Sequence, residues 1–167
     1  MRGHAHALNR EPADGFTLIE LLVVMSIASI LMAIGIFGFV NWQRTAQQQG
    51  SASQLVSGLR NASERSVSEG RTYCLDIDAG TSYTLWRYSC VAPAGTQVEG
   101  QYKAQSATIS FATTNTLPGG AACSAGHKCV YFYPRGTAVA TTVTVNSTVR
   151  SKVYTVHVEG LTARVWM

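Results

Sequence analysis

The stretch FTLIELLVVMSIASILMAIGIFGFV, residues 16–40, decides the fold of this chain. Its 25 residues include one ionisable side chain, Glu20. As an α-helix with a rise of about 1.5 Å per residue it would extend roughly 37 Å, whereas the hydrocarbon core of a bilayer is about 30 Å thick. We therefore expect residues 16–40 to cross a membrane once, as the first half of a long helix.

A short polar leader, residues 1–15, precedes this span. It contains Pro12 and too few apolar side chains to bury a core. Arg2 and Arg10 modestly favour the cytoplasmic side for this end of the chain, although Arg44 on the other flank weakens that inference. We interpret residues 1–15 as a segment outside the folded domain.

Residues 41–70 continue the helix on the polar side of the span, because they contain no proline and carry a helical pattern of small and apolar side chains. One face of period near 3.6 is formed by Leu55, Leu59, Ala62 and Ser66. Gly50 predicts a weak point within the helix, and Gly70 predicts its end. We expect this half to be amphipathic.

From residue 71 onward the hydrophobic pattern changes to a period of two, which is typical of β-strands. The expected strands cover residues 72–77, 82–88, 108–112, 129–133, 139–145, 154–158 and 161–165. Asp78-Ala79-Gly80 predicts a hairpin, while residues 92–100 and 113–127 are expected to be loops. The predicted fold class is α+β: a long N-terminal helix packed on residues 71–167, a domain of about seven antiparallel strands in two packed sheets.

All four cysteines, Cys74, Cys90, Cys123 and Cys129, follow the span. An even number on one side indicates two disulfides in an oxidising compartment. Three pairings are open; we favour Cys123 with Cys129 around a Gly-rich loop, which leaves Cys74 with Cys90. A zinc site is the alternative, but the spacing of the cysteines lacks the short Cys-x-x-Cys pairs that such sites commonly have.

Other ligand and catalytic patterns in the chain are weak. Asp76-x-Asp78-x-Gly80 is similar to the start of a calcium loop, but the bidentate acid that such a loop needs near its end is missing, so a hairpin turn explains it better. His127 and His157 have no nucleophile or orienting acid by motif. We expect no enzymatic activity, no metal and no cofactor.

The segment Gly15-Phe16-Thr17-Leu18-Ile19-Glu20 resembles the processing site of type IV prepilins and type II secretion pseudopilins. The resemblance implies that a membrane prepilin peptidase cuts between Gly15 and Phe16 and N-methylates Phe16. It also implies that Glu20 meets the amine of a neighbouring subunit and sets the register of a filament. A carboxylate in lipid is costly and needs such a partner. A secretory signal peptide is a poorer match, since its apolar core is only about 7–15 residues long.

Three later segments resemble the GspH/FimT branch of this superfamily: residues 53–71, the aromatic-x-Pro-x-Gly turn of residues 132–138, and the closing residues 158–165. DNA-uptake members of the branch carry a Gly-Arg-x-Arg motif, which is absent here because Leu161 follows Gly160. A phosphate contact through Arg150, Lys152 and Arg164 is a weaker hypothesis than solvated charge, because the basic side chains are scattered and the formal charge is only +4.

The resemblance implies a minor pseudopilin of a type II secretion system. Its partners would be other pseudopilins or pilins, the peptidase, the membrane assembly platform and lipid, with nucleic acid as a weaker candidate. The protein would be a single-pass inner-membrane protein with an extracytoplasmic domain, incorporated into a filament. One alternative is a minor type IV pilin for pilus assembly or DNA uptake, and another is a membrane-anchored binding domain that never polymerises.

Overall fold

The computed structural model describes residues 15–78, 80–106, 109–114 and 123–167, without the side chains of Phe37 and Arg150. The chain forms two compact units, one up to Trp42 and one from Gln43 to Met167. A single helix, α1 (Leu18–Ser68), runs through both. Its length agrees with the sequence prediction, although it begins two residues later than Phe16.

The end of α1 follows the expected glycine signal. Gly70 has φ +63°, a left-handed conformation that glycine adopts without strain. The backbone N–H of Arg71 donates to the carbonyl of Ser66 at 3.2 Å, which satisfies one of the last helical carbonyls. The helix therefore stops where the strands begin.

Nine strands follow α1 among the described residues. They are β1 (Tyr73–Ile77), β2 (Ser82–Arg87), β3 (Thr96–Lys103), β4 (Ile109–Thr114), β5 (Lys128–Tyr133), β6 (Thr137–Ala138), β7 (Thr141–Ser147), β8 (Arg150–Val158) and β9 (Val165–Trp166). They form two antiparallel sheets with the orders β3-β2-β1-β5-β6 and β4-β7-β8-β9. The α+β fold with two sheets is confirmed, and it has two strands more than expected.

The first hairpin forms as predicted. Strands β1 and β2 pair from Tyr73 opposite Arg87 to Ile77 opposite Tyr83. The N–H of Asp78 donates to the carbonyl of Ser82 at 3.0 Å, and Gly80 takes φ +150° in the turn. The Asp-x-Gly pattern is thus explained by the turn.

Three sequence predictions are wrong. Residues 113–114 were expected to be loop but belong to β4, and residues 115–122 of that expected loop lie outside the described residues. Residues 96–100 were expected to be loop but belong to β3, an edge strand whose side chains are mostly exposed. Val98 and Tyr102 are its half-buried contacts with the core, too few to give an apolar alternation. Residues 161–164 were expected to be strand, but Ala163 has φ +50° and only β9 remains extended.

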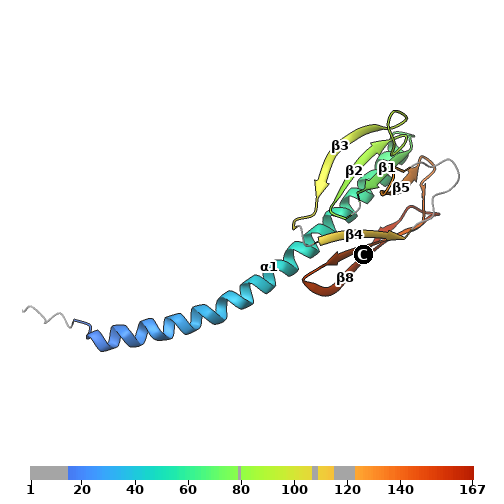
Figure 1. Ribbon diagram of the computed structural model, residues 1–167. Helices are drawn as coiled ribbons and strands as arrows, with labels where there is room; N and C mark the ends of the chain where they lie inside the picture. Colours follow the sequence, from blue (N-terminus) through green and yellow to red (C-terminus); the bar gives the residue numbers. More distant parts are fainter. Residues whose placement is uncertain (1–14, 79, 107–108, 115–122) are drawn as a thin grey trace, which may run out of the picture. The chain divides into compact units, whose positions relative to one another are not determined.

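The core of the second unit is shared by α1 and both sheets. The buried face of α1 includes the predicted positions Leu55, Leu59, Ala62 and Ser66, none of which is exposed. Aromatic and branched side chains of β1, β2, β4, β5, β7 and β8 pack against this face. Figure 1 shows the strands of both sheets gathered beside the C-terminal half of α1. A second, smaller cluster on the other face of the five-stranded sheet contains Cys74, Cys90, Cys129 and Tyr131.

Candidate functional site

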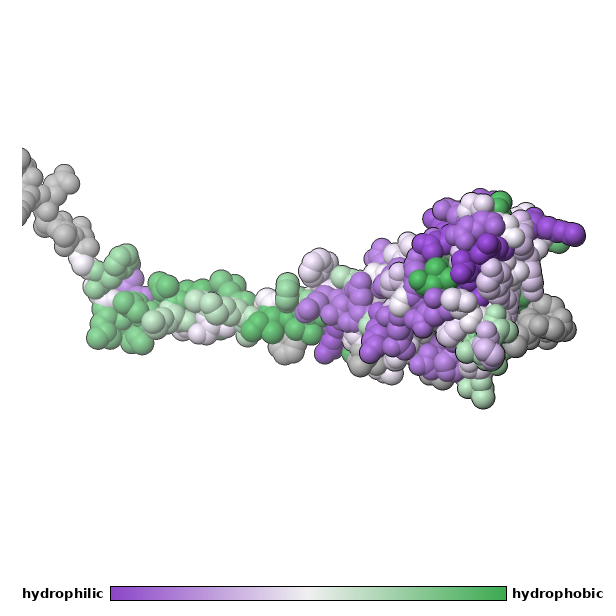
Figure 2. Space-filling model, turned by 90° about the horizontal axis from the view of Figure 1, so that it is seen from above, coloured by the Kyte–Doolittle hydropathy of each residue, from purple (hydrophilic) through white to green (hydrophobic). Residues whose placement is uncertain are grey.

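The first part of α1 is an exposed apolar surface. It is the one described helix that is long and apolar enough to cross a membrane, and none of its most apolar 18-residue window is buried. Figure 2 shows apolar side chains gathered along this part of the helix, whereas the visible face of the second unit is mostly polar. Ser26 and Ser29 turn their hydroxyls onto the helix backbone, donating to the carbonyls of Val23 and Met25 at 2.8 and 2.7 Å. The surface therefore offers lipid or other apolar helices almost no free polar group.

Glu20 lies in the first turn of α1. The hydroxyl oxygen of Thr17 accepts a hydrogen bond from the backbone N–H of Glu20 at 3.3 Å, so Thr17 is the N-cap. The pattern Thr-x-x-Glu is the signature of a capping box, and reading it would have placed the helix start at Leu18. Phe16 precedes the helix, and its side chain is exposed.

The charge of Glu20 has no opposite charge within the span, because residues 16–40 contain no Lys, Arg or His. An ionised carboxylate placed in hydrocarbon costs roughly 2.5–3.5 kcal/mol on insertion scales. The helix N-terminus offsets part of this, since its unpaired N–H groups favour a negative charge. The remaining cost is removed if a cation from another molecule binds there.

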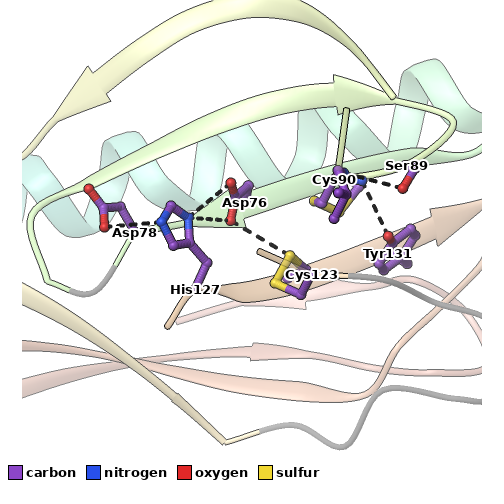
Figure 3. The surroundings of a disulfide bond; sticks show 10 residues. Asp76, Asp78, Ser89, Cys90, Cys123, His127 and Tyr131 are labelled. Carbon is purple, nitrogen blue, oxygen red and sulfur yellow. Dashed lines mark hydrogen bonds and ion pairs between the residues drawn. A yellow bond between two sulfur atoms is a disulfide. The ribbon is translucent and has the colours of Figure 1, made fainter. Parts of the chain in front are cut away.

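The second notable site lies on the outer face of the five-stranded sheet (Figure 3). The predicted disulfide Cys74–Cys90 is present, and a second disulfide joins Cys123 to Cys129. Cys74 and Cys129 lie on the neighbouring strands β1 and β5, which places the two bridges in one cluster. The N–H of Cys90 donates to the hydroxyl of Tyr131 at 3.2 Å.

A carboxylate and an imidazole lie beside this cluster. The side chain of Asp76 is only 9% exposed, and its two oxygens lie 3.0 and 3.1 Å from Nδ1 of His127. The other ring nitrogen of His127 lies 3.5 Å from Asp78. Burial raises the pKa of Asp76, while the nearby His127 opposes this effect. Sequence reasoning missed this group, because His127 and Asp76 are 51 residues apart and share no motif.

This group also bears on the zinc alternative. Sγ of Cys123 and Cys129 and a carboxylate oxygen of Asp76 all lie within 4.8 Å of one another. Both sulfurs are bound in a disulfide, however, and the thiolate is the form that ligates zinc. While the bridge is closed, these two sulfurs are therefore unsuited to ligate zinc.

Of the basic residues considered for DNA contact, Lys152 and Arg164 lie at opposite ends of β8. Lys152 lies on β8 with Nζ 4.8 Å from the ring centroid of Tyr154. Arg164 lies next to Val165, whose partner is Val158 at the other end of β8, so the two basic residues are roughly 20 Å apart. The side chain of Arg150 lies outside the described residues.

The hollow beside Arg164 does not suit an anion. Its volume is about 370 Å³, and Glu159, Arg164 and Trp166 line it. Glu159 brings a carboxylate to the same hollow and accepts a hydrogen bond from the hydroxyl of Thr162 at 2.8 Å. The geometry gives phosphate no preferred place here.

Two family models match the chain, one in each unit. The prokaryotic N-terminal methylation motif matches residues 13–36, and the family of the type II transport protein GspH matches residues 51–162. The chain belongs to the GspH family. Its resemblance to the H-type branch of the pseudopilins, noted from the sequence, is therefore confirmed.

Solved structures share the GspH-family fold at low sequence identity. The minor pseudopilin EpsH from the type 2 secretion system of Vibrio cholerae superposes with a TM-score of 0.56 at 12% identity, covering 72% of this chain and 96% of that one. The type IV minor pilin FimU of Pseudomonas aeruginosa gives a TM-score of 0.56 at 12% identity, covering 75% and 91%. No curated protein matches the chain by sequence.

Proposed function

We propose that this chain is a minor pseudopilin of a type II secretion system, which polymerises through the first part of α1 and supports protein export. The observation that carries the proposal is an apolar, exposed helix with one carboxylate in its first turn. Such a surface is satisfied in two environments, a bilayer and a bundle of like helices. Its role is structural, with neither catalysis nor a cofactor.

Processing supplies the missing cation in this proposal. A prepilin peptidase cuts between Gly15 and Phe16, which creates an α-amine one residue before the Thr17 cap, and the amine is then methylated. In the filament the amine of one subunit pairs with Glu20 of the next. Because a buried charge pair fixes helix register in other assemblies, the pair would set the stagger between subunits.

The description of the matched family as a type II transport protein supports secretion, whereas the solved structures of EpsH and FimU resemble the chain equally. The separation of Lys152 from Arg164 also favours secretion, because DNA uptake needs phosphate contacts that act together. The domain would lie on the extracytoplasmic side of the inner membrane, where cysteines oxidise. Other pseudopilins, the peptidase and the assembly platform would be its partners.

Intact mass of the membrane-extracted protein tests the processing step. The expected mass is that of residues 16–167 plus one methyl group. A mature chain that keeps Met1, or that begins near Asn41, contradicts the prepilin reading and supports an ordinary anchor or a signal peptide.

Glu20→Ala tests assembly, with Ser26→Ala as the matched control on the same helix. Glu20→Ala should leave insertion and cleavage unchanged, since the helix becomes more apolar, but crosslinking to partner subunits should fall. Ser26→Ala should change neither, because its hydroxyl bonds only within the helix. Equal crosslinking of wild type and Glu20→Ala would remove the register role.

Deletion of the gene separates the two filament classes. Loss of exported proteins from the medium, restored by wild type but not by Glu20→Ala, supports the secretion role. Loss of pili or of DNA uptake with normal secretion would assign the chain to a type IV pilus instead.

A further inference from the structure

The two disulfides differ in access to solvent. Cys74 and Cys90 are 0% and 1% exposed, so neither sulfur can be reached from outside. In the other bridge Cys129 is 1% exposed but Cys123 is half-buried. Of the four cysteines, Cys123 therefore has the largest exposed fraction, and thiol–disulfide exchange depends on access to a sulfur atom.

The buried sulfur of this bridge lies next to a carboxylate. Oδ1 of Asp76 is 3.6 Å from Sγ of Cys129, and Figure 3 shows Asp76 between His127 and the bridge. Asp76 faces Cys129 directly across the β1–β5 ladder, so the two side chains leave the sheet as neighbours, and His127 holds the carboxylate in place. A nearly buried carboxylate that touches a sulfur atom has no role in the filament proposal.

From this geometry we propose that Cys123–Cys129 is a thiol–disulfide exchange site in which Cys123 is the attacked sulfur and Asp76 is the general base for Cys129. The reactant is an external cysteine disulfide during oxidation and an external thiol during reduction. His127 is a positioning residue, because its Nδ1 holds the carboxylate. The inference is independent of the filament proposal.

Oxidation of the reduced Cys123 and Cys129 takes two exchange steps. The thiolate of Cys123 attacks one sulfur of the external disulfide, and the first external thiolate leaves with the proton that Cys123 gave up. Cys129 then transfers its proton to Asp76, and its thiolate attacks Sγ of Cys123. The second external thiolate leaves and takes the proton from Asp76. The protein loses two electrons and two protons, and the external disulfide becomes two thiols.

The environment of Asp76 suits a base. Burial raises the pKa of this carboxyl, so its carboxylate is a stronger base than an exposed aspartate. Asp78 provides a natural comparison, since its side chain is 48% exposed and it lies near the other nitrogen of His127. Replacing Asp78 changes the net charge equally but leaves the carboxylate at the sulfur.

Selective reduction of the full chain in detergent tests the site. Dithiothreitol is added to the native protein, portions are quenched with acid at intervals, the thiols are alkylated in denaturant, and peptides are mapped. Cys123 and Cys129 should be alkylated at least about tenfold faster than Cys74 and Cys90, which serve as the internal control. Equal rates for the two bridges would overturn the exchange site.

Closure of the reduced bridge tests the base. After removal of dithiothreitol, oxidised glutathione is added and closure is followed by acid quenching. Asp76→Asn should slow closure by about tenfold or more, and Asp78→Asn should stay within about twofold of wild type. Reduction should slow by the same factor, so the equilibrium between the two forms is unchanged. A merely structural role would shift that equilibrium instead.

Two outcomes decide against Asp76. One is an Asp76→Asn protein with native circular dichroism that closes the bridge at the wild-type rate. If that variant does not fold, His127→Gln replaces it, and closure should slow because the carboxylate is no longer held. A folded His127→Gln protein with unchanged rates in both directions would overturn the proposed base.

Discussion

Gly58 and Tyr83 are in such close contact that a Cβ atom at position 58 would lie 2.9 Å from Cε2 of the tyrosine ring. The hydroxyl of Tyr83 donates to the carbonyl of Gln54 at 3.0 Å, one helical turn earlier. The ring also stacks on Tyr102 of β3 at a centroid distance of 5.2 Å. A glycine within the helix therefore lets β2 and β3 approach α1.

Gly58→Ala should lower the free energy of unfolding by about 1–2 kcal/mol. The gain in helix propensity is about 1 kcal/mol, but overpacking costs about 1–3 kcal/mol and the bond from Tyr83 to Gln54 is displaced. Gly50→Ala is the matched control: its Cβ would meet only the flexible end of Gln105, so its stability should be unchanged or higher by up to about 1 kcal/mol. Urea unfolding of wild type and the two variants measures these differences. A Gly50→Ala protein that is less stable than Gly58→Ala would contradict the prediction.

Gln48→Leu should destabilise the second unit by about 2 kcal/mol or more. The side-chain amide of Gln48 is buried and donates to the carbonyls of Val145 and Lys152 at 3.2 and 2.6 Å. These carbonyls flank the register shift between β7 and β8, and each costs about 1–3 kcal/mol if left unsatisfied. Thermal unfolding measures the loss, with the exposed Gln49→Leu as control; equal melting temperatures would disprove the role of Gln48.

Removal of the two disulfides should have unequal effects. The chain-entropy model gives about 3 kcal/mol for a loop of about 15 residues and less for a shorter one. Cys74 and Cys90 are 16 residues apart and buried, whereas Cys123 and Cys129 are 6 apart. The double alanine variant of the first pair should therefore have the lower urea midpoint. The opposite order would mean that loop closure is not the main contribution.

Asp76→Asn should alter the dependence of stability on pH. Burial raises the pKa of Asp76 above its ordinary value of 3.8, so the folded state favours the protonated carboxyl. The protonated carboxyl therefore stabilises the folded protein fully below about pH 3.8. This stabilisation is lost as the pH rises through the pKa that Asp76 has in the folded state. The asparagine variant lacks this loss, so its stability relative to wild type should increase between about pH 3 and about pH 7. Unfolding of wild type, Asp76→Asn and Asp78→Asn across this range checks the sign; a falling difference would contradict it.

The helix and its buried face could be predicted because their signals are local. The apolar run, the period of Leu55, Leu59 and Ala62, and Gly70 all act within a few residues, and the structure agrees with each. The Thr17-x-x-Glu20 box was equally local and marks the true start of α1. These parts of the fold follow from propensity and hydrophobic pattern alone.

The features that could not be predicted depend on partners distant in the sequence. Strand β3 carries polar side chains because it is an edge, and only pairing with β2 makes it extended. The contact of His127 with Asp76 depends on the register of β1 against β5, which no pattern in one strand reveals. The same register places Cys129 opposite Asp76 and so brings its sulfur into the proposed exchange site.

Arg60 and Arg65 tie α1 to one edge strand of each sheet. The guanidinium of Arg60 donates to the carbonyl of Val165 on β9 at 3.1 Å, and that of Arg65 pairs with Glu99 on β3 at 2.5 Å. β9 and β3 are terminal strands of different sheets. We expect both sheets to resist a pull along α1 together, because sliding the helix would break the two guanidinium contacts at the same time. Force applied to the helix would then be shared between the two sheets, so neither sheet would have to detach first.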